Sequence, residues 1–339
     1  MQGTWESMNA YTSRGISVKT FCTKEAPINN KFDLGIFFGT FESRGLISSK
    51  ILADKSCNET IIVFFPEANQ SSYRRKYDQM LFDQVKSCSR NAPILIENES
   101  IRNCEILLQK LLKAIPKHCW NAKANWFFDI SGSPVPYFLG IAAAIRETYP
   151  RPKITMFNPT ANYDNPKNNE YSFTFGFDRL IWIPGLWGHP DPTLPTTYIF
   201  LLGFDGERSY EVFYRCDPDK VKVLYGKPGY KRRYENMALR RNRLLMEESG
   251  VVTRDSKNLL AADASDPIDT WKKMDKVVKS EQGKSNVIFV PVGLKAHAIG
   301  SALCALTDGI PGMIYHVPST YRIQDIKRGE YLWKYEIVL

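Results

Sequence analysis

The apolar positions of this chain fall into two kinds of segment that alternate along its length. Short runs such as IIVFF (61–65) and VIFV (287–290) are continuously apolar, as expected for strands covered by helices on both faces. Between them lie longer stretches with apolar residues at helical spacing, such as the stripe formed by Tyr73, Tyr77 and Leu81. Strands that alternate with helices in this way predict βαβ units and a mostly parallel sheet.

The same series of segments occurs twice. SSYRRKYDQM (71–80) and PGYKRRYENM (228–237) share one pattern of tyrosine, basic and acidic residues. Further landmarks match in the same order and at similar spacing: Gly39, Tyr73, Gly132 and Pro159 correspond to Gly203, Tyr230, Gly293 and Pro318. Self-similarity at a fixed period indicates a repeat architecture. The sequence therefore predicts an α/β fold with two tandem Rossmann-like units from an internal duplication, mostly parallel sheets and antiparallel edge strands.

The duplication sets the predicted domain boundaries. Residues 1–30 form an N-terminal extension, residues 31–184 the first unit and residues 198–339 the second. The linker between the units (185–197) is rich in proline and glycine, which favour turns and loops.

Each unit is predicted to end in an aromatic strand of its own. These strands are RLIWIPG (179–185) in the first unit and EYLWKYEIVL (330–339) in the second. The segment YSFTFGFDRLIWI (171–183) alternates around a Gly-Phe-Asp turn. This pattern predicts an antiparallel hairpin at the edge of the sheet.

The composition of the 339-residue chain is typical of a globular protein, with 43% hydrophobic and 24% charged residues. No apolar run is long enough to span a membrane, and the N-terminus lacks the layout of a signal peptide. We expect a soluble, cytoplasmic protein without a membrane partner. The cysteines are scattered and only four histidines are present, so Cys104 and Cys304 are expected to be buried free thiols, and neither a metal site nor a cofactor is expected.

The net charge of +9 favours an anionic partner such as a nucleotide, a nucleic acid or an acidic protein surface. Two basic clusters follow the second strand of each unit, at the presumed start of a helix: Arg74 and Arg75 in the first, and Lys231, Arg232 and Arg233 in the second. Basic groups at a helix N-terminus are unfavourable unless an anion is bound there. The alternative is a solvated basic face without a ligand.

Ligands of open parallel sheets bind beyond the carboxyl ends of the strands. The loop after the first strand of each unit provides Thr40, Glu42 and Arg44, and Gly203, Asp205, Glu207, Arg208 and Ser209. The loop after the fourth strand provides Ser131, Gly132 and Ser133, and Gly293 and Lys295. Small residues before a helix let backbone N–H groups approach an anion. Two alternatives remain open: the glycines serve only the turns, and the acid and arginine form a structural ion pair.

Known catalytic signatures are missing from the sequence. It contains no P-loop, no G-x-G-x-x-G fingerprint, no G-x-S-x-G elbow and no H-E-x-x-H motif. A nucleoside triphosphate used as fuel is therefore not expected. Acids clustered in a cleft would permit glycosidic or N-glycosidic cleavage, or metal-assisted phosphodiester cleavage. If the protein is an enzyme, Asp205, Glu207 and Arg208 are the candidate catalytic residues, because the C-terminal half places two acids beside an arginine.

The fourth-strand segments DISGSPVPYFLGIAAA (129–144) and VPVGLKAHAIGSALCA (290–305) combine a strand, a small-residue turn and an Ala-rich helix. In this they resemble the CRISPR-associated Rossmann-fold (CARF) sensor domains of bacterial antiphage defence. The resemblance implies a sensor that binds a cyclic or linear oligonucleotide and acts with a separate effector protein. A nucleotide- or nucleoside-processing hydrolase and a non-catalytic scaffold subunit are the alternative functions.

Overall fold

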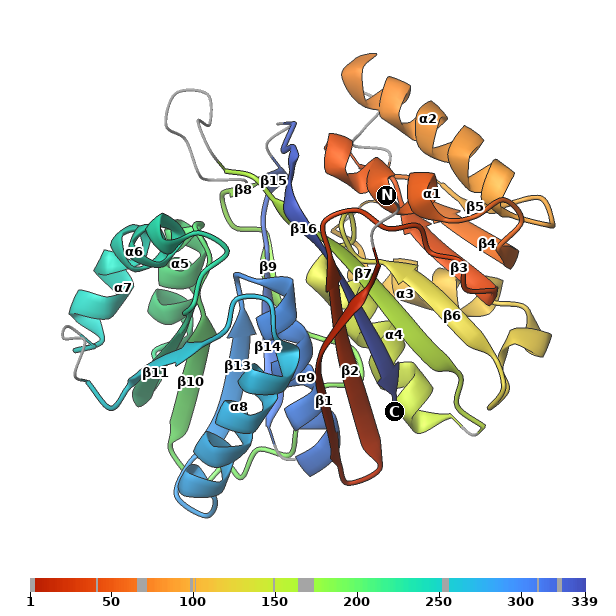
Figure 1. Cartoon of the computed structure of the whole chain (residues 1–339). Coiled ribbons are helices and arrows are strands. Elements are labelled where there is room, and N and C mark those ends of the chain that lie inside the picture. The colour runs from red at the N-terminus through yellow and green to blue at the C-terminus, as the bar shows by residue number, and fades with distance from the viewer. Residues whose placement is uncertain are drawn as a thin grey trace. The chain divides into compact units, whose positions relative to one another are not determined.

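The computed structural model describes residues 4–40, 42–65, 72–97, 100, 102–148, 150–163, 174–251, 256–309, 311–321 and 325–339, without the side chains of residues 72–75. The chain forms two compact units (Figure 1). Unit 1 comprises Met1–Asp164 and Ile323–Leu339, and unit 2 comprises Asn165–Arg322.

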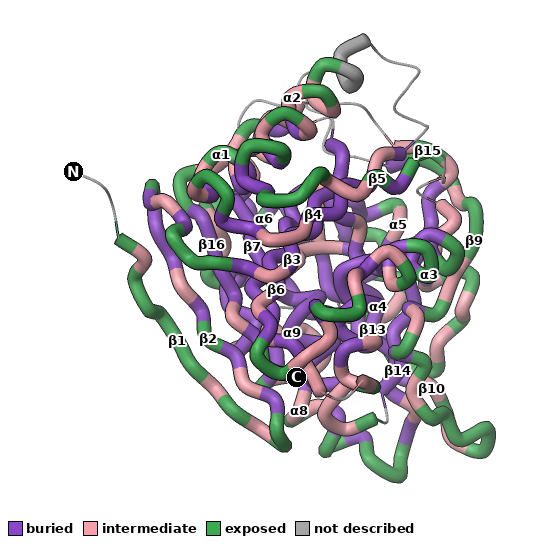
Figure 2. The backbone as a smooth tube through the Cα atoms, turned by 90° about the vertical axis from the view of Figure 1, so that its right-hand side faces the viewer, coloured by how far each residue is buried: buried purple, intermediate pink, exposed green. Residues whose placement is uncertain are grey.

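Unit 1 is built on an eight-stranded sheet in the order β1-β2-β16-β7-β6-β3-β4-β5. The strands are β1 (Glu6–Ser13), β2 (Ile16–Thr23), β3 (Phe32–Phe38), β4 (Cys57–Val63), β5 (Ile94–Ile96), β6 (Asn125–Asp129), β7 (Lys153–Ala161) and β16 (Arg328–Val338). The five strands from β7 to β5 are parallel, whereas β1, β2 and β16 add an antiparallel part. Strands β3, β6 and β7 are buried along most of their length, and β1 is mostly exposed (Figure 2).

The helices of unit 1 connect its parallel strands. They are α1 (Ile47–Ile51), α2 (Ser72–Cys88), α3 (Cys104–Ala114) and α4 (Val135–Glu147), with short 3-10 helices at Ser43–Leu46 and Lys117–Cys119. α1 packs beside α2 and α3 beside α4, as right-handed crossovers on opposite faces of the sheet require. Phe37, Phe127 and Phe157 form the centre of the core, with ring centroids 5.7 and 6.0 Å apart.

Unit 2 is built on a six-stranded sheet in the order β12-β11-β10-β13-β14-β9. The strands are β9 (Arg179–Trp182), β10 (Thr196–Leu201), β11 (Lys220–Gly226), β12 (Leu259–Ala262), β13 (Asn286–Pro291) and β14 (Gly312–Val317). All are parallel except β9, which pairs antiparallel with β14. A separate two-stranded sheet joins β8 (Thr174–Phe175) to β15 (Thr320–Tyr321).

The helices of unit 2 repeat the arrangement of unit 1. They are α5 (Gly206–Cys216), α6 (Arg232–Arg241), α7 (Arg243–Glu248), α8 (Pro267–Glu281) and α9 (Lys295–Asp308). Asp266 is the N-cap of α8, and its carboxylate accepts a hydrogen bond from the Ile268 N–H at 2.8 Å. Pro267 is the first residue of the helix, a position where proline is preferred. α9 ends at Gly309, which has a φ of +69° and so adopts the left-handed conformation common at helix ends.

The structure confirms the predicted duplication. The parallel strands follow the order β7-β6-β3-β4-β5 in unit 1 and β14-β13-β10-β11-β12 in unit 2, which is the same order for equivalent strands. The helices near Tyr73 and Tyr230, α2 and α6, both follow the second strand of this arrangement. The fold is therefore mixed α/β with two largely parallel, Rossmann-like sheets.

The last strand of each sequence half pairs in the unit formed mainly by the other half. β9, from the predicted first unit (31–184), pairs with β14 of unit 2. β16, from the predicted second unit (198–339), lies between β2 and β7 of unit 1. The N-terminal residues 1–30 also join unit 1 through β1 and β2. The compact units thus differ from the predicted boundaries, because a hydrophobic pattern identifies a strand but not the neighbour with which it pairs.

The predicted hairpin over 171–183 needs a similar correction. Two short strands do flank the Gly-Phe-Asp turn, but β8 pairs with β15 and β9 pairs with β14. Residues 171–173 of the segment lie outside the described residues. The expected antiparallel edge strand is therefore present as β9, without the hairpin partner.

Further sequence expectations concern membranes and cysteines. None of the helices in the described ranges is long and apolar enough to cross a membrane. Cys104 and Cys304 are buried free thiols, as predicted. In the same part of the chain no cluster of three or more histidine, cysteine, aspartate or glutamate side chains is arranged to hold a metal ion.

Candidate functional site

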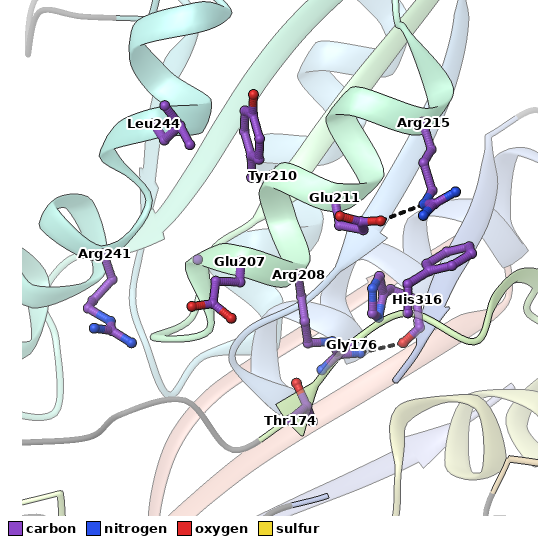
Figure 3. A pocket seen from close by; sticks show the side chains of 12 residues that line it. Thr174, Gly176, Glu207, Arg208, Tyr210, Glu211, Arg215, Arg241, Leu244 and His316 are labelled. Atoms are coloured by element: carbon purple, nitrogen blue, oxygen red, sulfur yellow. Dashed lines mark hydrogen bonds and ion pairs between the residues drawn. The ribbon is translucent and has the colours of Figure 1, made fainter. Parts of the chain in front are cut away.

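A cavity of about 580 Å³ opens in unit 2 beside the start of α5 (Figure 3). Its walls come from α5, from β8 and the turn after it, from the α6–α7 region and from the end of β14. The lining residues are Thr174, Gly176, Phe177, Gly206, Glu207, Arg208, Tyr210, Glu211, Arg215, Arg241, Leu244 and His316. We call this cavity the α5 pocket.

The α6–α7 junction reaches the α5 pocket because Gly206 has no side chain. A Cβ atom on Gly206 would lie 1.9 Å from the carbonyl oxygen of Arg241. The amide of Asn242 holds the junction in place by donating to the carbonyls of Gly203 and Ala238, both at 2.8 Å. This close approach brings Arg241 and Leu244 into the wall of the pocket.

The side chain of Arg208 is held in place by neighbouring residues, and one of its donor atoms has no described partner. Its Nη2 donates to the carbonyl of His316 at 2.7 Å, and its guanidinium lies 4.9 Å from the ring centroid of Tyr315. Burial acts to lower the pKa of Arg208, but Tyr315 and Asp205 outweigh burial and raise the pKa above its ordinary value. The buried Nε has no hydrogen-bond partner in the described part of the chain. The pocket wall thus contains a permanently charged side chain with one buried donor that has no described partner.

Arg44, the equivalent residue of unit 1, has a different environment. Its Nε is hydrogen-bonded and ion-paired with Glu42, and its Nη1 donates to the carbonyl of Pro159 at 3.3 Å. The side chains of Arg44 and Glu42 are only 11% and 17% exposed. Both arginines therefore contact a carbonyl at the end of an equivalent strand, but Arg44 also forms the ion pair with a neighbouring glutamate that the sequence analysis considered as an alternative.

His316 is a pocket residue that the sequence analysis missed. It is buried at the end of β14, and its ring lies edge-on to Phe177 at 5.4 Å. Burial lowers its pKa to about 4, and the positive charges of Arg208 and Arg215 act in the same direction. The imidazole is therefore neutral at pH 7, and its Nδ1 has no hydrogen-bond partner within the described ranges. A lone histidine in the apolar strand GMIYHV was the only sequence signal.

Asp205 directly precedes α5 and is buried. One carboxylate oxygen accepts a hydrogen bond from the hydroxyl of Thr174, and the other has no partner among the residues described. Burial raises the pKa of Asp205, and Arg208 partly opposes this effect. The buried hydroxyl of Ser209 also lacks a partner in this set. Of the predicted acids, Glu207 rather than Asp205 lines the pocket.

The later part of α5 contributes residues that the sequence analysis did not consider. Arg215 pairs with Glu211 at 2.6 Å and lies over the ring of Phe177 at 3.7 Å. The hydroxyl of Tyr210 donates to the carboxylate of Glu248 at 3.0 Å. These side chains lie on the body of a helix, whereas the prediction considered only the loops that precede helices.

The glycines predicted to form an anion cradle in unit 2 instead pack against each other. A Cβ atom on Gly203 would lie 2.7 Å from the Cα of Gly293, and one on Gly293 would lie 2.1 Å from the carbonyl oxygen of Leu202. This contact closes the space between the loops after β10 and β13. Lys295 is the first residue of α9 and does not line the α5 pocket.

In the corresponding loops of unit 1, polar side chains form hydrogen bonds to other groups of the same loop. Asp129 accepts hydrogen bonds from the Ser131 N–H at 2.8 Å and from the Ser131 hydroxyl at 2.5 Å. Thr40 accepts from the Glu42 N–H at 3.0 Å, and Ser133 donates to the carbonyl of Pro134 at 3.2 Å. Gly132 lies against β3, where a Cβ would be 3.0 Å from the carbonyl oxygen of Phe38. These residues therefore have clear structural roles.

The basic cluster of unit 2 lies outside the α5 pocket. Lys231, Arg232 and Arg233 are exposed at the start of α6. Lys231 and Arg233 lie 5.9 and 5.6 Å from the ring centroid of Tyr234. In unit 1, the side chains of Arg74 and Arg75 lie outside the described residues.

No protein-family model matches this chain, and no curated protein matches it either. Its fold and the α5 pocket describe it as a duplicated, Rossmann-like α/β protein with a cavity in unit 2 that is lined by residues of both charges.

Proposed function

We propose that unit 2 recognises an anionic ligand, a nucleotide or oligonucleotide, in the α5 pocket. The observation that carries this proposal is Arg208 in the pocket wall, whose buried Nε has no hydrogen-bond partner among the described residues, beside the neutral ring of His316. The planar, permanently charged guanidinium group is well suited to phosphate and carboxylate groups. The cavity volume of about 580 Å³ falls within the range of small-molecule sites, about 300–1,000 Å³.

Two further features support the proposal that the ligand is an anion. α5 begins at the pocket with Gly206, so the positive end of the helix and its first N–H groups face this region. The net charge of +9 would attract anionic ligands from solution. Affinity for a phosphate-bearing ligand should then fall as the salt concentration rises.

The wider role we propose is that of a recognition protein in a bacterial defence system. This part of the proposal rests on the resemblance of residues 129–144 and 290–305 to CARF sensor domains. The two Rossmann-like sheets are compatible with it. A separate effector protein would then carry out the response to the bound ligand.

The second candidate is a hydrolase of nucleotides or nucleosides. The raised pKa of Asp205 favours it, because a carboxyl group that keeps its proton can act as a general acid. Glu207 and Arg208 line the cavity nearby. Asp205 is not among the lining residues, however, so the geometry supports binding better than catalysis. The exposed Lys231, Arg232 and Arg233 favour a third role, a scaffold that docks an acidic protein.

A thermal-shift screen of the full chain with nucleotides and short oligonucleotides tests the proposal, because a ligand of the native state raises the melting temperature. Hits would be checked for turnover and for salt dependence. Binding without turnover supports recognition, and turnover supports the hydrolase. If no anion in the screen binds, the scaffold role is the one that remains.

The matched variants Arg208→Lys and Arg44→Lys locate the site. Lysine keeps the charge but loses the planar fork. We expect Arg208→Lys to weaken binding by roughly tenfold or more. It should also lower the unfolding free energy by about 1 kcal/mol, because the hydrogen bond to the His316 carbonyl is lost. Arg44→Lys should keep the affinity but lower the unfolding free energy by about 2 kcal/mol, since its bond to Glu42 is lost. Unchanged affinity in Arg208→Lys would place the ligand elsewhere.

A further inference from the structure

The wall of the α5 pocket carries both signs of charge. Arg208, Arg215 and Arg241 contribute positive charge, and Glu207 and Glu211 contribute negative charge. The pair formed by Arg215 and Glu211 at 2.6 Å largely neutralises itself. The other lining charges are two positive, from Arg208 and Arg241, and one negative, from Glu207. The buried Asp205 beside them also interacts with both arginines, so the lining offers at most about one net positive charge.

His316 does not add to this positive charge. Its pKa is lowered to about 4, chiefly by burial, so the ring is neutral at physiological pH. It supplies a polar nitrogen, Nδ1, that is buried and without a partner in the described part of the chain. The pocket therefore resembles a site for one anionic group with hydrogen-bonding neighbours, and not a strongly basic polyphosphate site.

Glu207 is the lining carboxylate that the negative charge of a ligand would meet. It lies in the first turn of α5, is exposed, and forms no ion pair or hydrogen bond with any described residue. A carboxylate next to an anion site repels each additional negative charge of the ligand. The same carboxylate accepts hydrogen bonds from hydroxyl groups, as acids do at the ribose of bound nucleotides.

The pocket also has an apolar part. Tyr210 and Leu244 lie near each other, away from the group formed by Arg208, His316 and Thr174 (Figure 3). Tyr210 is held in position by its bond to Glu248 at 3.0 Å and by the ring of Tyr214 at 6.4 Å. A rigid aromatic ring suits contact with a flat, weakly polar group such as a nucleobase.

We infer that the α5 pocket selects a ribonucleotide with a single phosphate group over the corresponding di- and triphosphates. The inference rests on the proposed function and specifies its ligand. The phosphate contacts Arg208, the ribose hydroxyls donate to Glu207, and the base lies against Tyr210 and Leu244. Each extra phosphate adds negative charge that the pocket cannot balance, and Glu207 opposes it.

Calorimetric titration of the full chain, without divalent metal, tests the inference. The probes are the nucleosides of the four common RNA bases with their 5′-mono-, di- and triphosphates, and the 2′-deoxy monophosphates. For the best base, the ribonucleoside monophosphate should bind about tenfold tighter than the nucleoside and roughly fivefold tighter than the triphosphate. The 2′-deoxy monophosphate should bind more weakly than its ribose counterpart.

The outcomes separate the inference from the proposed function. Affinity that increases from mono- to triphosphate would overturn the inference and leave anion recognition intact, as would a protein that binds only oligonucleotides. If neither nucleotides nor oligonucleotides bind, both ideas fail.

The variant Glu207→Gln provides a second test. Loss of the negative charge should raise the affinity for the triphosphate by roughly fivefold and reduce the preference for the monophosphate. The matched control Glu105→Gln makes the same change in net charge at an exposed position on α3 of unit 1, and should leave both affinities unchanged. Equal effects of the two variants would show that overall charge, and not Glu207, governs the affinities.

Discussion

At the scale of the residue, Arg44 and Arg208 differ because of where the neighbouring glutamate lies. Glu42 precedes Arg44 by two positions at the start of a 3-10 helix and contacts its Nε. Glu207 is adjacent to Arg208 within α5, and consecutive residues of a helix point in different directions. The carboxylate of Glu207 therefore does not bond to the Nε of Arg208, which has no hydrogen-bond partner among the described residues. The spacing between glutamate and arginine thus differs by one position between the two units. This difference separates the ion-paired Arg44 from Arg208, which is a candidate contact for a ligand.

The buried histidines of unit 2 make its stability depend on pH. Burial lowers the pKa of His297 to about 4, although the carbonyl of Asp263, 3.1 Å from Nε2, acts in the opposite direction. In the unfolded chain the same group titrates near 6.5. The unfolded state therefore binds more protons below that pH, and folding stability decreases as the pH falls from about 6.5 toward about 4.

We expect His297 to account for roughly 2 kcal/mol of stability lost between neutral pH and about pH 5. Urea unfolding of the wild type and of His297→Gln at both pH values measures this contribution. The variant should be less stable than the wild type at neutral pH but should lose less on acidification. An equal loss in the two proteins would show that His297 does not titrate in this range.

At the scale of the element, the pocket depends on the contact between the start of α5 and the α6–α7 junction. Gly206→Ala places a Cβ 1.9 Å from the backbone carbonyl of Arg241, so the junction must move. We expect a loss of roughly 1–3 kcal/mol in stability and weaker ligand binding, because Arg241 and Leu244 shift with the junction. Thermal unfolding and calorimetry measure both effects.

Gly140→Ala in α4 is the matched control for that substitution. Its Cβ would meet only the tip of the Leu108 side chain at 2.6 Å, which can rotate away. The control should change stability little and leave binding intact. If Gly206→Ala behaves like Gly140→Ala, the α5–α6 contact is more adaptable than the structure indicates.

Elements and their order could be predicted from the sequence because the signals are local. Continuous apolar runs identified the parallel strands, and the repeat identified their equivalence. The pairing of β9 and β16 could not be predicted, since an aromatic strand such as RLIW or EYLWKYEIV fits either sheet. The α5 pocket was found only in part, because Tyr210, Arg215 and His316 are brought together by tertiary packing without a motif.

At the scale of the whole molecule, the two sequence halves complete each other's sheets. β16 fills the position between β2 and β7, with Leu332, Tyr335 and Ile337 buried. β9 covers the edge of β14 in unit 2. Neither half of the sequence contains all strands of one unit, so the units depend on each other through the chain that connects them.

Separate expression of residues 1–184 and 198–339 tests this dependence. Each fragment lacks an antiparallel strand of its unit and exposes an unpaired edge, which favours aggregation. We expect neither fragment to form a stable monomer alone, and co-expression to give a soluble complex with the size of the intact chain. Size-exclusion chromatography and circular dichroism report the outcome. A fragment that unfolds cooperatively near the melting temperature of the intact protein would contradict it.

The position of β16 also sets the order of events on the ribosome. Unit 1 consists mostly of residues 1–164, yet its sheet stays open between β2 and β7 until residues 328–338 have been made. All of unit 2 is translated during this interval, and domains usually fold as they emerge. A nascent chain that stops before residue 328 therefore carries an incomplete sheet with two open edges, which chaperones and proteases can recognise. In this protein, the sheet of unit 1 can therefore be completed only after translation has reached residue 338.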